Sequence, residues 1–319
     1  MNKAIVIIGP TSSGKTLLAL QIAKKINGVI VSADSRQIYK FMDIGTGKTP
    51  INSSLEIKKL NDKWQIDGID VYMYDLVFPN EAFSVSTYVE KAKQIINRII
   101  ENNQTPIIVG GTGFYIDILT SSQKIFQVKP DLKLRTELYA LSLKEIQDKF
   151  IQLKSDKFEN IDMNNPVRLV RAIEIILSGK NDENIGLENF EYLKIALTAD
   201  REYLFLRVDN WVDAILEDLI VEVKDLIDRG YKNSEALQGV IYKNVYSYLI
   251  GEIILKDDLK NKIKFELHGY IRRQQTYFKR IQDVTWYNIV DNTFDQVVLK
   301  QVESFYNVKN SNQINRQIK

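Results

Sequence analysis

Eight consecutive residues near the start of the chain have the types and the spacing of a phosphate-binding loop. In order, they are Gly9, Pro10, Thr11, Ser12, Ser13, Gly14, Lys15 and Thr16. Glycines let the backbone curl so that several N–H groups point at one anion, and the N-terminus of a following helix adds partial positive charge. Lys15 would supply a full positive charge, and the Thr16 hydroxyl can hold a Mg²⁺ ion. The pattern predicts that the loop binds phosphate; the alternative is a chance glycine-rich turn.

Asp34 is the carboxylate that the sequence pairs with this loop. An ordinary kinase or ATPase needs an acidic residue at the end of a second apolar strand to hold Mg²⁺. The strand predicted over residues 106–109 is instead followed by two glycines and Thr112, whereas Asp34 ends the strand predicted over 29–33. Because the carboxyl ends of parallel strands line the ligand crevice, we expect the loop, Asp34 and Thr112 to converge on one site.

The elements that must position these residues alternate between strand and helix. The predicted strands span residues 4–8, 29–33, 68–77 and 106–109. The predicted helices span residues 16–25 and 84–100, and Ser84 or Ser86 is the N-cap of the second one. This alternation predicts an α/β fold, with a P-loop NTPase-like parallel sheet flanked by helices.

The pattern changes after about residue 120. Segments 131–153 and 166–177 are helical in pattern, with no strong strand between them, and 193–197 is again typical of a strand. The stretch is either a separate helical domain or a helical insertion, and we favour the insertion because strands bracket it. The predicted organisation is a core of 1–120 and 192–306, an α-helical insertion domain at 121–191, C-terminal helices near 209–229, 243–255 and 257–282, and a frayed tail at 307–319.

Composition narrows the possible chemistry. The 319 residues include no cysteine and one histidine, His268, which excludes disulfides and thiolate catalysis and argues against a site of several histidines. No apolar run reaches the roughly 20 residues that span a bilayer, and the N-terminus lacks a signal-peptide pattern, so we expect no membrane partner and a cytoplasmic location. The net charge of +2 neither supports nor excludes a nucleic-acid partner. However, basic and aromatic residues are concentrated at positions 264–280.

A family resemblance enters through an ordered set of segments. Besides the loop, they are Asp34-Ser35-Arg36-Gln37-Ile38-Tyr39, Met42-Asp43-Ile44-Gly45-Thr46-Gly47-Lys48, Gly110-Gly111-Thr112-Gly113-Phe114-Tyr115, Asn165-Pro166-Val167-Arg168-Leu169-Val170-Arg171-Ala172, Asp200-Arg201, Arg207, Ile241-Tyr242-Lys243 and Arg272-Arg273-Gln274-Gln275-Thr276-Tyr277-Phe278. Together they closely resemble the tRNA dimethylallyltransferases, in the same order and over residues 4 to about 290. The loop alone would be weak support for this family, whereas the ordered set is strong.

The resemblance implies a reaction and its partners. Enzymes of this family transfer a dimethylallyl group from dimethylallyl diphosphate to the exocyclic N6 amine of the adenosine adjacent (3′) to the anticodon in tRNA, and release diphosphate. The implied partners are therefore tRNA, through its anticodon stem-loop, and dimethylallyl diphosphate. The implied cofactor is Mg²⁺, the implied oligomeric state is a monomer, and the helical insertion would bind tRNA.

The resemblance also assigns roles to matching positions. Asp34 matches the proposed general base, Thr112 a residue beside the reaction channel, and Arg207 an arginine that helps to hold the diphosphate. The loop from Gly9 to Thr16 would bind the diphosphate, with Thr16 at the metal. The tRNA-contacting positions would be Asp34, Ser35, Arg36, Gln37, Thr112, Arg135, Val167, Arg168, Leu169, Val170 and Arg171.

Each role has a simpler structural alternative. Asp34 could be a helix N-cap or a Mg²⁺ ligand in a kinase, and Arg207 could form a surface salt bridge at a strand end. Arg168 and Arg171 are three residues apart and share a helix face, so they could be ordinary solvated cations. The apolar stripe predicted opposite them consists of Leu169, Val170, Ile173, Ile176 and Leu177.

Three other functions compete with tRNA prenylation: a small-molecule kinase, a non-catalytic RNA-binding protein, and an enzyme that prenylates free adenine nucleotides. The missing strand-terminal Asp counts against a kinase, and the presence of Lys15, Thr16 and Asp34 counts against loss of catalysis. The helical insertion and the basic C-terminal helix favour an RNA substrate.

Several positions depart from the family's pattern. Trp211 stands where a second arginine often follows the one at Arg207, and His268 replaces an upstream arginine. Ile241 replaces a glycine, Tyr277 replaces a tryptophan, and Met73-Tyr74-Asp75 replaces paired histidines. These departures concern the grip on tRNA and diphosphate rather than the loop or Asp34.

Overall fold

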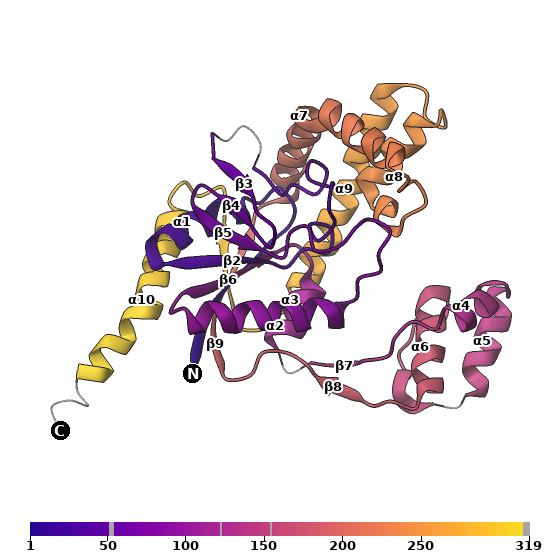
Figure 1. The fold of residues 1–319 in the computed structure, drawn as a ribbon, viewed down its shortest axis with the longest axis horizontal. Helices are drawn as coiled ribbons and strands as arrows, with labels where there is room; N and C mark the ends of the chain where they lie inside the picture. Colours follow the sequence, from indigo (N-terminus) through magenta and orange to yellow (C-terminus); the bar gives the residue numbers. More distant parts are fainter. Residues whose placement is uncertain (51–53, 122, 154, 315–319) are drawn as a thin grey trace. The chain divides into compact units, whose positions relative to one another are not determined.

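The computed structural model describes residues 1–50, 54–121, 123–153 and 155–314. The chain divides into two compact units, Met1–Ser121 with Leu187–Lys319 and, between them in sequence, Ser122–Gly186. We call them the core unit and the helical unit, and Figure 1 draws the course of the chain through both.

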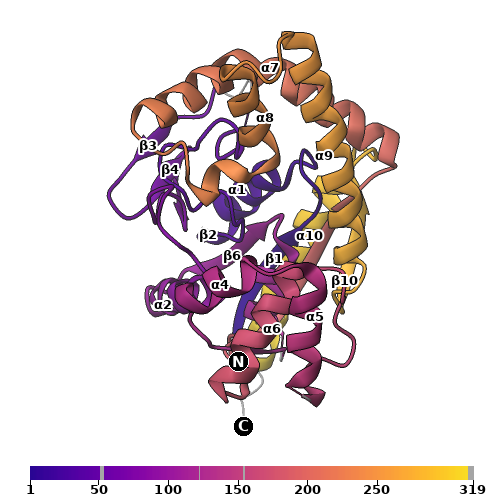
Figure 2. The same ribbon diagram turned by 90° about the vertical axis from the view of Figure 1, so that its right-hand side faces the viewer.

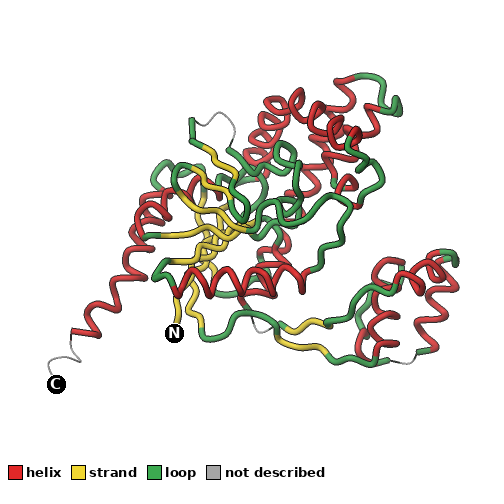
Figure 3. Tube along the Cα trace, viewed as in Figure 1, coloured by secondary structure: helices red, strands yellow, loops and turns green. Residues whose placement is uncertain are grey.

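A mostly parallel sheet forms the centre of the core unit. Within the described residues its strand order is β10-β9-β1-β6-β2-β5-β4-β3, and the pairs from β10 to β5 are parallel. These six strands are β1 (Asn2–Ile8), β2 (Gly28–Ser32), β5 (Ile69–Tyr72), β6 (Thr105–Gly110), β9 (Phe190–Thr198) and β10 (Val284–Asn288). At one edge, β3 (Ile57–Lys59) and β4 (Trp64–Ile66) continue the sheet in antiparallel fashion. Figure 3 shows the strands in yellow.

The central strands are continuous apolar runs because helices cover both faces of the sheet. Figure 1 shows α1 (Lys15–Ile26) and α10 (Phe294–Ile314) on one face, and α2 (Val85–Glu101) and α3 (Gly113–Thr120) on the other. Ser84 is the N-cap of α2, because its hydroxyl accepts a hydrogen bond from the Thr87 backbone N–H at 3.1 Å. Ile5 and Ile107, at paired positions on β1 and β6, are fully buried.

Three more helices of the core unit pack against one another: α7 (Arg201–Asp228), α8 (Val240–Leu249) and α9 (Lys256–Phe278). Figure 2, turned by 90°, shows α7 and α9 crossing beside α8. Helix α7 begins at Arg201, eight residues before the predicted start near 209, because its buried stripe already begins at Leu204. It therefore follows β9 almost directly.

The segment at 193–197 forms part of β9, which pairs in parallel with β1, as expected for a chain that returns to the first sheet. At the C-terminus, helix α10 includes residues 307–314, and residues 315–319 of the predicted tail lie outside the described residues. β10 was not predicted at all. Among the described residues, no helix is long and apolar enough to cross a membrane.

In its described residues, the helical unit contains a strand pair, β7 (Lys124–Phe126) and β8 (Asp182–Asn184), and three α-helices, α4 (Leu132–Tyr139), α5 (Leu143–Gln152) and α6 (Pro166–Ser178). The single helical stretch predicted over 131–153 is two helices, because Ser142 and Glu145 form a capping box that starts α5. Leu169, Val170 and Ile173 of α6 lie in the unit's core. Leu177, placed in the same stripe by sequence, is 57% exposed.

Candidate active site

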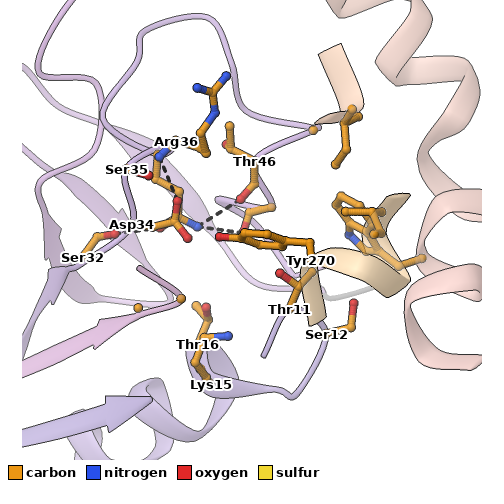
Figure 4. A pocket seen from close by; sticks show the side chains of 18 of the residues that line it. Thr11, Ser12, Lys15, Thr16, Ser32, Asp34, Ser35, Arg36, Thr46 and Tyr270 are labelled. Carbon is orange, nitrogen blue, oxygen red and sulfur yellow. Dashed lines mark hydrogen bonds between the residues drawn. The ribbon is translucent and has the colours of Figure 1, made fainter. Parts of the chain in front are cut away.

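A pocket of about 730 Å³ lies in the core unit, where the loop after β1 meets the carboxyl ends of β2 and β6. Helices α7, α8 and α9 contribute further lining through Arg207, Tyr242 and Tyr270, among others. Figure 4 shows that the side chains of Lys15, Thr16, Asp34 and Tyr270 face the same space. The predicted loop and Asp34 therefore share one cavity.

The loop between β1 and α1 has the backbone geometry that its glycines permit. Gly9 has φ 156° and lies so close to its neighbours that a Cβ there would be 2.8 Å from the Leu197 carbonyl oxygen. Gly14, with φ 90°, occupies the N-cap position of α1, and no side chain in the described structure caps that helix end. The first-turn N–H groups of α1 therefore remain available to an anion in the pocket, and the helix dipole favours its charge.

Two cations are held against this loop. Lys15 Nζ donates to the Pro10 carbonyl oxygen at 2.8 Å, and Arg207 Nε donates to the Ser12 carbonyl oxygen at 2.7 Å. Burial lowers the pKa of the Lys15 ammonium to about 8, although the nearby Asp34 carboxylate acts in the opposite direction. Arg207 is in the second turn of α7. The alternative interpretation, a surface salt bridge at a strand end, is therefore wrong.

Asp34 and Thr112 lie side by side at the ends of β2 and β6. Asp34 Oδ1 accepts the Arg36 backbone N–H at 2.8 Å, which forms a tight turn, and no helix of the described chain begins there. The N-cap interpretation of Asp34 is therefore wrong. Thr112 Oγ1 accepts the Ser35 N–H at 2.9 Å and so ties the two strand ends together. A Cβ on Gly111 would lie 3.3 Å from Asp34 Oδ2, so glycine allows this close approach.

Gln274 connects the loop after β1 to the turn after β6, and the sequence analysis gave it no role. On α9, its side-chain oxygen accepts the Thr11 N–H at 2.9 Å and its amide nitrogen donates to the Gly111 carbonyl at 3.0 Å. The side chain is 5% exposed, so both bonds are shielded from water. Gln274 was visible in the resemblance as part of the Arg-Gln motif, but nothing local indicated what it would contact.

An apolar wall completes the pocket. Trp211, one helical turn after Arg207 on α7, lines it together with Ile241, Tyr242 and Leu267. Because Arg207 and Trp211 are four residues apart, they share one face of the helix, and this spacing could have indicated Trp211 from sequence. The pocket therefore has a cationic, hydrogen-bonding end and an apolar side.

Arg36 and Gln37, predicted to contact tRNA, are already engaged within the core unit. The Arg36 guanidinium donates to the Ala236 carbonyl. The Gln37 amide nitrogen donates to the Thr46 carbonyl at 3.2 Å, while its oxygen accepts from the Ser32 hydroxyl at 2.7 Å. Both residues line the pocket and shape its wall.

In the helical unit, the predicted tRNA contacts divide into three groups. Val167 is 63% exposed and Arg168 is exposed, whereas Leu169 and Val170 are buried in the core of the unit. Arg135 Nε and Nη2 donate to the two oxygens of the buried Glu174 at 2.7 and 2.9 Å. Arg171 also donates to Glu174, at 3.1 Å. Arg135 and Arg171 therefore stabilise the helical unit through their bonds to Glu174.

A metal ion would find few protein ligands here. In the described part of the chain, no group of three or more His, Asp or Glu side chains has the arrangement of a metal site. Thr16, at the start of α1, offers a hydroxyl to the pocket. Mg²⁺ typically keeps several waters and binds through one or two protein groups plus substrate phosphates, so this sparse set fits a metal carried mainly by a diphosphate.

Comparison with known families agrees with this geometry. The family model described as IPP transferase matches residues 37–281, which is most of the chain. The chain belongs to the IPP transferase family. A second model, Isopentenyl transferase, matches residues 2–71 and so includes the loop.

Relatives of the IPP transferase family cover nearly the whole chain. A tRNA dimethylallyltransferase of Acetivibrio thermocellus is 36% identical over 96% of this chain and 97% of its own. One from Bacillus cereus is 35% identical over 98% of each. The crystal structure of the tRNA isopentenylpyrophosphate transferase from Bacillus halodurans is similar, with a TM-score of 0.69, 29% identity, and coverage of 99% of this chain and 100% of that one.

Proposed function

We propose that this chain is a tRNA dimethylallyltransferase, which moves a dimethylallyl group from dimethylallyl diphosphate to N6 of the adenosine on the 3′ side of the anticodon. One observation carries the proposal: the glycine-rich loop after β1, Arg207 and the Asp34 carboxylate all line one pocket. The names of its full-length relatives support the same reaction.

The loop end of the pocket suits a departing diphosphate. Bond cleavage leaves an allylic, cation-like carbon and builds negative charge on the diphosphate oxygens. We infer that the phosphate-loop backbone, the Lys15 ammonium and the Arg207 guanidinium stabilise that charge. Groups that are already oriented act most strongly where water is excluded, and Arg207 is oriented by its bond to the Ser12 carbonyl.

Mg²⁺, when bound, would neutralise part of the diphosphate charge. Thr16 is the residue that would hold it, since its hydroxyl lies in the pocket at the start of α1. The remaining ligands would be diphosphate oxygens and water.

We infer that Asp34 acts on the amine, since it lines the same pocket as the loop. Adenine's exocyclic amine is a poor nucleophile because its lone pair is delocalised into the ring, and it becomes acidic as the new N–C bond forms. The Asp34 carboxylate would then take the proton. The Arg36 N–H bond to Oδ1 and the close approach to Gly111 fix the orientation of this carboxylate. The target base must leave its stack to reach the pocket, and a loop that is partly unstacked lowers that cost.

The direct test is to incubate the protein with unmodified tRNA, dimethylallyl diphosphate and Mg²⁺, then digest the RNA and detect prenylated adenosine by mass spectrometry. A parallel reaction with AMP separates the rival function. Product from AMP but not from tRNA would overturn the proposal.

The role of Asp34 has its own test, the Asp34→Asn substitution. Asparagine keeps the oxygen that accepts the Arg36 N–H but cannot take a proton at neutral pH, so we expect kcat to fall about 10²–10⁴-fold. Binding of tRNA, measured by filter retention, should change far less. Asp62→Asn, on the surface of the same unit, is the control. Equal losses in turnover and RNA affinity would show that Asp34 mainly holds RNA.

A further inference from the structure

Residues 43–49 form an irregular segment that lines the pocket without belonging to the sheet. Gly45, Thr46, Gly47 and Thr49 all face the cavity, on the side of the apolar wall. Buried backbone N–H groups need partners, and two of those in this segment find them internally: Gly47 donates to the Ile44 carbonyl at 3.1 Å and Lys48 to the Asp43 carbonyl at 3.2 Å. Further groups that hold the segment come from α7 and from a buried lysine.

Glu222 of α7 accepts hydrogen bonds from three backbone N–H groups at the start of this segment and from one side chain of α8. Its Oε2 accepts the N–H groups of Asp43 and Ile44, both at 2.7 Å. Its Oε1 accepts the Gly45 N–H at 3.2 Å and the Tyr242 hydroxyl at 2.7 Å. Burial, then the charge and hydrogen bond of Glu222, raise the pKa of Tyr242, so that hydroxyl stays protonated and remains a donor.

The backbone at Gly45 lies unusually close to α7 and α8. A Cβ there would be 2.8 Å from both Leu219 Cδ1 and the Tyr242 ring. The close approach is independent of the hydrogen bonds and places the same loop against the same two helices. At its other end the segment is anchored by Lys48, a fully buried side chain whose ammonium donates to the Tyr39 carbonyl at 2.7 Å and to Asp43 at 2.6 Å.

A chain of contacts links this segment to the reacting side of the pocket. The carbonyl oxygens of Thr46 and Gly47 accept hydrogen bonds from the Gln37 amide at 3.2 and 3.3 Å. Gln37 in turn accepts from Ser32, and these two residues flank the Asp34 turn in sequence. The Glu222 carboxylate therefore helps to hold the loop wall in place and, through Gln37, supports the turn that carries Asp34.

We propose that Glu222 is a positioning residue for prenyl transfer, acting by holding the 43–47 wall and Tyr242 in place around the reacting groups. The proposal rests on the function proposed above, because it assumes that Asp34 and this wall serve the transfer step. Glu222 does not itself line the pocket. Its removal should therefore reduce turnover and leave the anion-binding end intact.

The test compares Glu222→Ala and Glu222→Gln with a matched control, Glu217→Gln, which removes a charge from an exposed position on the same helix. Alanine removes an acceptor from all four donors, whereas glutamine can keep the two short bonds to Asp43 and Ile44. A displacement of about 1 Å can cost on the order of 10²-fold in rate, so we expect kcat to fall about 10–100-fold in the alanine variant and less in the glutamine variant. Pyrophosphate affinity, measured by calorimetry, should stay within about twofold.

Wild-type kcat in the folded alanine variant would overturn the proposal, as would a loss of pyrophosphate affinity that parallels the loss of kcat. If alanine prevents folding, a glutamine variant with wild-type kcat would overturn it. Failure of the proposed function is a different result, because the wild-type protein would then form no prenylated tRNA.

Discussion

Lys15 should give the reaction a pH dependence that can be calculated. Burial lowers the pKa of its ammonium to about 8, far below the ordinary lysine value. Roughly nine-tenths of the free protein then carries this charge at pH 7 and roughly one-tenth at pH 9. The charged form is the one that attracts a diphosphate, so kcat/KM for the prenyl donor should be constant below pH 7 and fall roughly tenfold per pH unit well above 8.

Bound diphosphate shifts this equilibrium in a definite direction. An anion beside the ammonium favours its charged form and raises its pKa, so the decline in kcat should begin at higher pH than the decline in kcat/KM. The assay is the initial rate of tRNA prenylation from pH 6.5 to 9.5 at varied donor concentration.

Lys15→Met is the control for the titration of Lys15. Its activity should be lower on the order of 10²–10³-fold, as expected for removal of a group that stabilises the developing charge. Its kcat/KM should also no longer fall above pH 8. The variant also corrects for ionisation of the RNA bases at high pH. A flat wild-type profile between pH 7 and 9, or the same decline in Lys15→Met, would refute the reasoning.

Two further substitutions test the site and the helical unit. Gln274→Ala leaves the Thr11 N–H and the Gly111 carbonyl unpaired, so we expect kcat to fall about 10–100-fold in the prenylation assay; unchanged turnover would remove Gln274 from the site's framework. Glu174→Ala leaves two arginines without their buried partner. It should lower the free energy of local unfolding in α6 by about 3 kcal/mol, the lower end for a broken buried pair because both arginines are partly exposed. Hydrogen exchange of the α6 amides measures this free energy, and Glu137→Ala is the control variant.

The sequence predicted best where the signal is local. The strand, loop and helix around Gly14 follow from apolar periodicity and glycine spacing. The hairpin at the sheet edge also had a local signal that was not used. Asp67 and Gly68, with φ 51° and 80°, form the two-residue turn between β4 and β5, and an Asp-Gly pair between apolar runs is typical of such a hairpin.

Long-range contacts set the limit of prediction. No local pattern indicates that Glu222 reaches the 43–45 backbone, since the bonded positions are 177 to 179 residues apart. Helical periodicity, however, already restricted the proposed tRNA contacts. Consecutive residues of a helix point in different directions, so Val167, Arg168, Leu169 and Val170 could not all face one partner. The buried pair, Leu169 and Val170, belongs to the apolar stripe that the same sequence predicted.

The two hydrogen bonds of the Gln274 side chain have a consequence for how the protein is synthesised. Thr11 and its partner on α9 are 263 residues apart, so at about 5–20 residues per second a ribosome adds Gln274 some 10–50 s after the phosphate loop. During that interval the nascent chain carries the loop without the amide that joins it to the Gly111 turn. Any product that ends before α9 would therefore keep the recognisable motif yet have an unassembled site, so competence for transfer appears only after α9 has been synthesised.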